Sequence, residues 1–140
     1  MPTWDEVSVG ESLPGFAARV RRVDLVMYAG ASGDFNPIHW NERVAKSVGL
    51  PDVIGHGMLT MAIAGRIVTE WTGDPGAIES YEVRFSRPVV VPDDDRGAEI
   101  RVGATVVDKL EDGRVVVDIT AVCGDDEVLT SARAVALLRV

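Results

Sequence analysis

The spacing of hydrophobic residues changes near residue 76 and divides the chain into a mainly helical part and a β-rich part. Residues 57–71 (GMLTMAIAGRIVTEW) place apolar side chains on almost every helical face, which is typical of a buried helix. At roughly 1.5 Å per residue, this helix is about 20 Å long. The runs that follow are rich in valine and bounded by turn residues, as in strands. We expect an antiparallel meander of strands over 78–91, 98–110, 114–123 and 128–138.

The first half of the chain contains shorter predicted elements. Residues 13–23 alternate loosely between apolar and polar types, which indicates a strand. Asp24 is expected to cap a short helix that ends at Gly30 or Gly33. One or two helical turns are expected over 42–48. The predicted order is a strand, short helices, one buried helix and an antiparallel sheet, which is an α+β fold.

Composition narrows the class of protein. A chain of 140 residues that is 46% hydrophobic fits one domain, expected over 1–140, with a real core. Its net charge of −8 argues against a nucleic-acid surface. The single cysteine, Cys123, excludes an internal disulfide and fits a reducing compartment. Residues 1–12 lack the features of a secretory signal, and no segment is apolar enough to span a bilayer, so we expect a cytoplasmic protein without membrane contact.

The loop at residues 32–40 (SGDFNPIHW) concentrates groups that can transfer protons. Pro37 restricts its own φ and favours an extended Asn36, so the path from Asp34 to His39 is stiff. Such a loop can present a carboxylate and an imidazole on one side, with Asn36 supporting them. His39 suits a general base, and Asp34 suits a general acid if apolar neighbours disfavour its charged form. The same residue types also favour turns, so the spacing alone leaves a purely structural Asx-turn open.

A second candidate group lies at the predicted start of the long helix, where residues 54–59 read IGHGML. Gly57 is expected to offer a free backbone N–H at the positive end of the helix dipole. Such a donor can stabilise an oxyanion on a carbonyl group. The alternative is that the glycines only allow the helix to begin. We expect His56 to be structural, and no ligand spacing supports a metal site formed by Asp34, His39 and His56.

Three stretches of the chain together resemble one known family. Residues 28–39 (YAGASGDFNPIH), followed by Ala45, resemble the signature of the MaoC-like (R)-specific enoyl-thioester hydratases. Residues 56–58 (HGM) and 84–89 (RFSRPV) fit the same family. The resemblance covers most of the chain and implies a single hot-dog fold, in which an antiparallel sheet wraps a long central helix. That fold agrees with the predicted order of elements.

The resemblance also implies a reaction and a set of site residues. Asp34 and His39 become the catalytic pair, and Asn36 and Gly57 become substrate-binding residues, with the Gly57 N–H as the oxyanion donor. The implied reaction is reversible hydration of a trans-2-enoyl thioester, carried by CoA or an acyl carrier protein (ACP), to a (3R)-3-hydroxyacyl thioester. No cofactor and no metal are expected. Either member of the pair can take the α-proton.

Similarity to the catalytic subunits of heterodimeric 3-hydroxyacyl-ACP dehydratases leaves both a homodimer and a heterodimer with a second hot-dog subunit open. The serine that some members carry on the central helix is missing, since residues 63–65 read IAG. Any part that this serine has in binding must be absent here or performed by another group.

Two other functions fit parts of the sequence. A hot-dog thioesterase is expected to carry a carboxylate on the central helix, where Glu70 lies near the far end beside Arg66. A non-catalytic acyl-thioester-binding subunit is the other alternative, although the intact Asp34 and His39 argue against it. Arginines that can meet CoA phosphates or an acidic carrier protein are Arg19, Arg21, Arg22, Arg66, Arg84 and Arg87.

Overall fold

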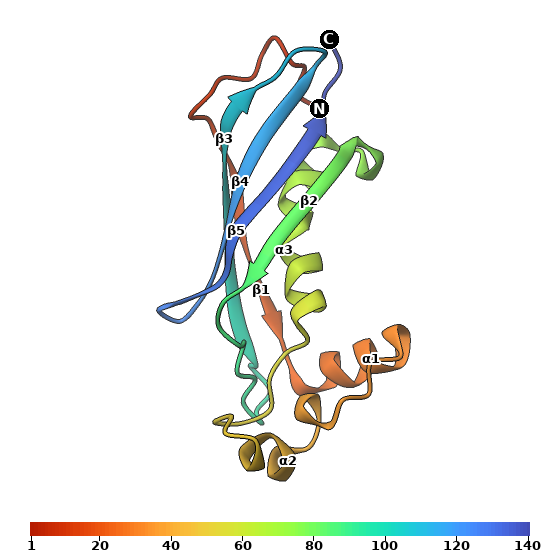
Figure 1. Ribbon diagram of the computed structural model, residues 1–140, viewed down its shortest axis with the longest axis vertical. Helices are drawn as coiled ribbons and strands as arrows, with labels where there is room; N and C mark the ends of the chain where they lie inside the picture. Colours follow the sequence, from red (N-terminus) through yellow and green to blue (C-terminus); the bar gives the residue numbers. More distant parts are fainter.

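The structure is a computed structural model that describes residues 1–140. One long helix lies along an antiparallel sheet, and short helices gather at one end (Figure 1). The strands are β1 (Ser12–Val20), β2 (Ile78–Phe85), β3 (Ala98–Lys109), β4 (Arg114–Cys123) and β5 (Asp126–Leu137). The helices are α1 (Arg22–Ser32), α2 (Glu42–Ser47) and α3 (Gly57–Thr72), with 3₁₀ turns η1 (Pro37–His39) and η2 (Pro75–Ala77). The predicted α+β class is confirmed.

The sheet has the order β1-β3-β4-β5-β2, and all neighbouring strands are antiparallel. The prediction of one strand over 78–91 is wrong in its second half, because β2 ends at Phe85. Pro88 cannot donate to a sheet ladder. The following residues instead pair with the segment that precedes α3. Gly55 N–H donates to Val89 O at 2.8 Å, and Val91 N–H donates to Val53 O at 2.9 Å.

The hydrophobic core lies between the sheet and one side of α3. Alternate residues of β3, β4 and β5 are buried, and Ala64, Ile67 and Val68 of α3 face them. Gly65 allows close approach of β2, because an added Cβ would lie 2.9 Å from the Tyr81 ring. The Tyr81 hydroxyl donates to Met61 O at 2.9 Å, and burial raises the pKa of Tyr81 to about 12. This contact anchors the middle of α3 on the sheet.

The other side of α3 is less enclosed than the sequence predicts. Met58, Ala62, Arg66 and Glu70 follow one another at intervals of four residues, and all four are exposed. Because the five strands of one chain cover only one side of the helix, the prediction of burial nearly all round is wrong for this chain alone. The exposed stripe is apolar near the start of α3 and charged near its end. No helix combines the length and the apolar character needed to cross a membrane.

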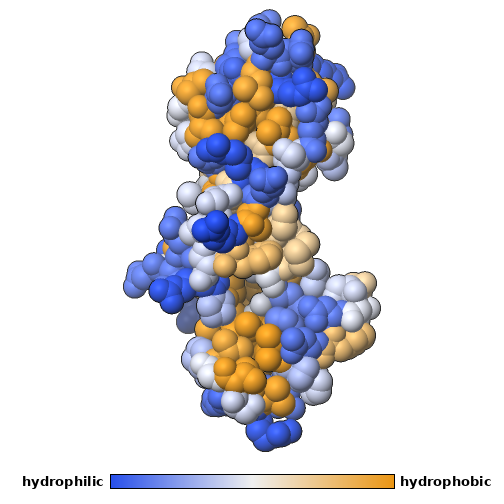
Figure 2. All heavy atoms as spheres, in the orientation of Figure 1, coloured by the Kyte–Doolittle hydropathy of each residue, from blue (hydrophilic) through white to orange (hydrophobic).

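A separate apolar surface lies at the end of the molecule that carries α1 and α2 (Figure 2). Val26, Phe35 and Trp40 line a shallow hollow there together with Ala29. Trp40 Nε1 donates to Phe35 O at 3.0 Å, which holds the loop closed. Phe35 is 63% exposed, so it does not enclose Asp34 as the sequence argument required.

Candidate active site

The end of α1 positions Asp34. The helix begins at Arg22, earlier than predicted, and Asp24 lies in its first turn, where the carboxylate accepts from Arg21 N–H at 2.7 Å. Gly33 ends the helix with φ 76°, a left-handed conformation that costs glycine little, and its N–H donates to Ala29 O. The chain therefore leaves the helix axis immediately before Asp34. Asp34 Oδ1 accepts from Asn36 N–H at 3.1 Å. This contact is the Asx-turn, and it leaves Oδ2 free.

The turn η1 positions His39. Asn36 precedes Pro37 with ψ 122°, the extended conformation that the sequence predicts, and its Oδ1 accepts from Ile38 N–H at 3.2 Å. Asn36 therefore supports the loop that carries the pair. The His39 ring is buried, and its Nδ1 lies 2.7 Å from Ile54 O. A carbonyl oxygen can only accept, so Nδ1 carries the proton and Nε2 presents a lone pair.

Asp34 and His39 face each other through their remaining polar atoms. His39 Nε2 lies 3.9 Å from Asp34 Oδ2. This separation is too long for a direct hydrogen bond, and one water oxygen can lie about 2.8 Å from both atoms. The Asx-turn uses one carboxylate oxygen, and the other faces His39. The turn and the pair are therefore compatible in one structure.

The start of α3 supplies the third group. The helix begins at Gly57, as predicted, and His56 precedes it without a side-chain cap. Gly57 N–H donates to no other group of the chain. A Cβ at this position would lie 3.2 Å from the Phe85 ring. Gly57 therefore offers a free N–H donor, and a side chain at this position would crowd the Phe85 ring.

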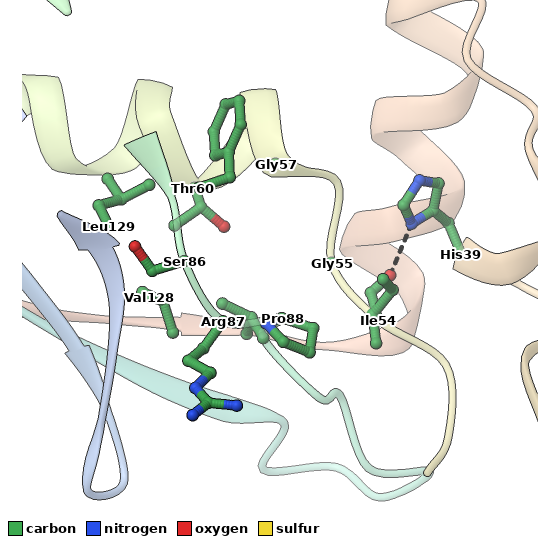
Figure 3. A pocket seen from close by; sticks show the side chains of 12 residues that line it. His39, Ile54, Gly55, Gly57, Thr60, Ser86, Arg87, Pro88, Val128 and Leu129 are labelled. Atoms are coloured by element: carbon green, nitrogen blue, oxygen red, sulfur yellow. Dashed lines mark hydrogen bonds between the residues drawn. The ribbon is translucent and has the colours of Figure 1, made fainter. Parts of the chain in front are cut away.

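His39 and Gly57 line one cavity of about 360 Å³ between the start of α3 and the segment that follows β2 (Figure 3). The other lining residues are Ile54, Gly55, Thr60, Phe85, Ser86, Arg87, Pro88, Val89, Val128 and Leu129. Asp34 reaches this cavity only through its approach to His39, and Asn36 does not line it. Sequence reasoning missed Thr60, Ser86 and the two β5 residues, because nothing local connects them with the loop at 32–40.

His56 completes a cluster of possible metal ligands. Asp34, His39 and His56 offer ligand atoms that all lie within 4.8 Å of one another. The two imidazole rings, however, are stacked, with centroids 3.8 Å apart and an interplanar angle of 24°. A metal ion binds in the plane of an imidazole ring, so an ion in the plane of one ring lies well outside the plane of the other. The cluster does not fit a tetrahedral zinc site.

The charged residues considered as alternatives lie elsewhere or are paired. Glu70 accepts from Arg66 at 2.7 Å near the far end of α3, and it does not line the cavity. Arg19, Arg21 and Arg22 pair with Glu99, Asp24 and Asp52, respectively. Of the arginines named above, only Arg87 lines the cavity.

Comparison with known proteins gives consistent matches. Residues 8–122 match the family described as MaoC like domain. The 3-hydroxyacyl-thioester dehydratase X of Mycobacterium tuberculosis is 40% identical over 80 residues, which are 56% of this chain and 27% of that protein. A solved structure described as a MaoC-like dehydratase superposes with a TM-score of 0.94 at 41% identity, covering 98% of this chain and 42% of the other. For the unliganded R-hydratase PhaJ1 of Pseudomonas aeruginosa, the TM-score is 0.83 at 25% identity, with 98% and 85% covered.

These matches and the arrangement of α3 on the sheet define a single hot-dog domain, which confirms the predicted fold. The chain belongs to the MaoC-like domain family. It spans 62% or less of the length of the first curated relatives that it matches.

Proposed function

We propose that the chain catalyses the reversible hydration of trans-2-enoyl thioesters to (3R)-3-hydroxyacyl thioesters, which makes it a hydro-lyase. The observation that carries this proposal is the facing pair of Asp34 Oδ2 and His39 Nε2 at 3.9 Å, with the free N–H of Gly57 in the cavity that His39 lines. The names of the thioester dehydratase and of the R-hydratase among the similar proteins support the same reaction.

In the hydration direction, a water molecule lies between Asp34 and His39. One member of the pair removes a proton from the water as its oxygen bonds to C3 of the enoyl group, and the other delivers a proton to C2. The reverse reaction uses the same pair with the roles exchanged. No redox step occurs. The base gains one proton and the acid loses one, so the pair as a whole keeps its proton count, and transfer of a proton from one member to the other restores the starting state. The His39 tautomer supports this scheme, because the lone pair on Nε2 is directed to the carboxylate side.

Gly57 acts on the charge that develops elsewhere in the substrate. Addition of water at C3 moves electron density onto the thioester oxygen, giving an enolate-like transition state. The free Gly57 N–H at the positive end of α3 stabilises this oxygen. Asn36 belongs to the same proposal as a binding residue that acts by holding the loop, since its Oδ1 caps η1.

The test is an assay of purified protein with crotonyl-CoA and a longer enoyl-CoA, following the loss of enoyl absorbance. Asp34→Asn and His39→Ala should each lower kcat by roughly 100-fold or more, the scale of general acid–base catalysis. Asp95→Asn is the matched control, because it makes the same chemical change in an exposed loop. Circular dichroism shows whether each variant is folded. Folded Asp34 and His39 variants with the wild-type rate would rule out the proposed mechanism.

The acyl carrier is either CoA or a carrier protein. Arg87 supports either carrier, since it lines the cavity and forms no ion pair with a carboxylate of the chain. Kinetics with matched enoyl-CoA and enoyl-ACP substrates of increasing chain length distinguish the carriers. A preference for one carrier appears as a lower KM at each chain length.

We also propose that the chain works as a dimer of hot-dog units, with a second copy or with a different subunit. β2 pairs only with β5 and leaves one edge free, and the exposed stripe of α3 begins with apolar Met58 and Ala62. Light scattering of the purified chain, alone and after co-expression with a second hot-dog subunit, gives the assembly state. A chain that stays monomeric and is fully active alone would contradict this part of the proposal.

A further inference from the structure

His56 contacts both members of the proposed pair from outside the cavity. Its side chain is fully enclosed, with 1% of the residue exposed. His56 Nε2 lies 3.2 Å from Asp34 O, and its ring stacks on the His39 ring at 3.8 Å. On another side, the Tyr28 ring lies 4.7 Å away at 60°. The titratable groups facing His56 are thus Tyr28 from α1, Asp34 from the loop and His39 from η1.

The hydrogen bonds assign the tautomer of His56. Asp34 O can only accept, so His56 Nε2 carries the proton and Nδ1 holds a lone pair. Nδ1 is buried and has no partner in the chain. An unpaired buried polar atom is destabilising. A phenyl ring would fill similar space without this cost, so packing alone does not explain an imidazole here. The feature that a phenyl ring lacks is the donor at Nε2.

We propose that His56 is a positioning residue for the hydration reaction, holding Asp34 through its Nε2–H and His39 through the face of its ring. This inference rests on the proposed function. The hydrogen bond to Asp34 O fixes the backbone at the carboxylate, and the stacked ring fixes the plane of the His39 imidazole. One side chain therefore sets the mutual orientation of the two groups that exchange protons with the substrate.

The charge state of His56 suits this role. Burial lowers the pKa of His56, so the ring stays neutral near pH 7. When His39 takes up a proton during the reaction, its positive charge then lies on a neutral aromatic face. A charged His56 at the same distance would oppose that proton transfer by like-charge repulsion.

Two substitutions separate the two contacts. His56→Phe keeps a ring to stack on His39 and removes the donor to Asp34 O. His56→Gln keeps a donor near the position of Nε2 and removes the ring, and His56→Leu removes both. Because small errors in the placement of reacting groups can cost up to about 100-fold, we expect kcat to fall roughly tenfold in the first two variants and roughly 100-fold in the third. KM for crotonyl-CoA should change less than about threefold, because His56 does not line the cavity.

A second measurement does not depend on activity. The chain contains only two histidines, so nitrogen-15 NMR resolves both rings. When both rings are neutral, the spectrum should show opposite tautomers, with the proton on Nδ1 of His39 and on Nε2 of His56. In His56→Phe, the chemical shift of His39 Nε2 should change, because the stacked imidazole is replaced by a phenyl ring.

The outcomes separate the two proposals. A wild-type protein without hydratase activity would contradict the proposed function. Opposite tautomers in that protein would still support the arrangement of the two rings described above. An active wild type whose folded Phe and Gln variants keep kcat within twofold would overturn the role of His56. A loss confined to KM, or identical tautomers in the two rings, would overturn it as well. If His56→Leu does not fold, the Phe and Gln variants carry the test.

Discussion

The two ends of α3 are built in opposite ways. At the C-terminal end, Gly73 adopts φ 66° and its N–H donates to Thr69 O, while the Thr72 hydroxyl donates to Asp74 O at 3.0 Å. At the N-terminal end, His56 provides no side-chain cap and Gly57 N–H has no partner in the chain. The first turn of α3 also has no acidic residue, whereas α1 has Asp24 and α2 has Glu42.

The two ends of α3 differ in how their backbone groups find partners. Free N–H groups at a helix start normally receive a side-chain or solvent partner, and an acidic residue in the first turn would offset the positive end of the dipole. At the N-terminal end of α3, where the cavity and both histidines lie, the Gly57 N–H has no partner in the chain and the first turn has no acidic residue. We call this the open end. The C-terminal end, called the closed end below, is instead capped from within the chain by Gly73 N–H and by the Thr72 hydroxyl. We infer that the open end serves the substrate and that the closed end serves stability.

The strongest test of the open end removes the Gly57 N–H itself. Gly57→Pro deletes the donor at the first helical position, where proline is tolerated, and His56 already has φ −62° and ψ 132°, which suit a residue before proline. Loss of one oxyanion donor should lower kcat by roughly 10²–10³-fold. Steady-state kinetics with crotonyl-CoA measures the effect.

Gly57→Ala is the matched control for this substitution. It adds the same Cβ beside the Phe85 ring at 3.2 Å and retains the N–H, so the steric effect of the Cβ is shared. The proline variant should therefore be much slower than the alanine variant at equal thermal stability. Equal kcat values in the two variants would show that the N–H has no part in the reaction.

The closed end is tested by Gly73→Ala. A left-handed conformation costs a residue with a Cβ about 1–2 kcal/mol, so the free energy of unfolding should fall by that amount. The Met1 side chain lies 2.8 Å from the new Cβ, and its flexible thioether can move aside. Urea unfolding provides the measurement. Gly30→Ala is the control, because Gly30 lies in α1 with a negative φ and open space around it, and there we expect no loss.

Local sequence signals predicted both ends of α3 because their causes are local. A glycine before an apolar run marked the start at Gly57, and the predicted end at residue 71 lies one residue before the observed end at Thr72. The loop at 32–40 was predictable for the same reason, since Pro37 restricts Asn36 and the Asx-turn involves neighbouring residues. The roles of Asp34, His39, Asn36 and Gly57 in the reaction remain predictions.

Features that depend on distant segments were not predictable. β2 ends at Phe85 because Val89 and Val91 pair with residues more than 30 positions earlier. No local sequence pattern indicates this long-range pairing. The cavity walls at Thr60, Ser86 and Val128 come from three such segments. His56 was expected to be structural, and its stacking on His39 appears only when η1 and the start of α3 come together.

The middle of α3 offers a further test of the contrast between its two ends, because we expect the contact with Tyr81 to anchor it independently of both. Gly65→Ala gains about 1 kcal/mol of helix propensity and places a Cβ 2.9 Å from the Tyr81 ring, where overpacking costs about 1–3 kcal/mol. We expect a net loss of about 1 kcal/mol in urea unfolding. In a Tyr81→Ala background, the same substitution should become stabilising by about 1 kcal/mol. Equal effects in both backgrounds would show that Tyr81 does not limit the approach.

The smallest effect is expected at Glu70, the charged residue near the closed end. Its carboxylate pairs with Arg66, and both side chains are about half exposed, so solvent screens the pair. Glu70→Gln should change the free energy of unfolding by at most about 0.5 kcal/mol and should leave hydratase kcat unchanged. This substitution preserves the stacking of Arg66 on the Phe16 ring, so it isolates the ion pair. A thiol reagent in the same assay follows release of free CoA from acyl-CoA. If Glu70→Gln abolished such release in a wild-type protein that shows it, the closed end would also be a catalytic site, and the division between the two ends of α3 would fail.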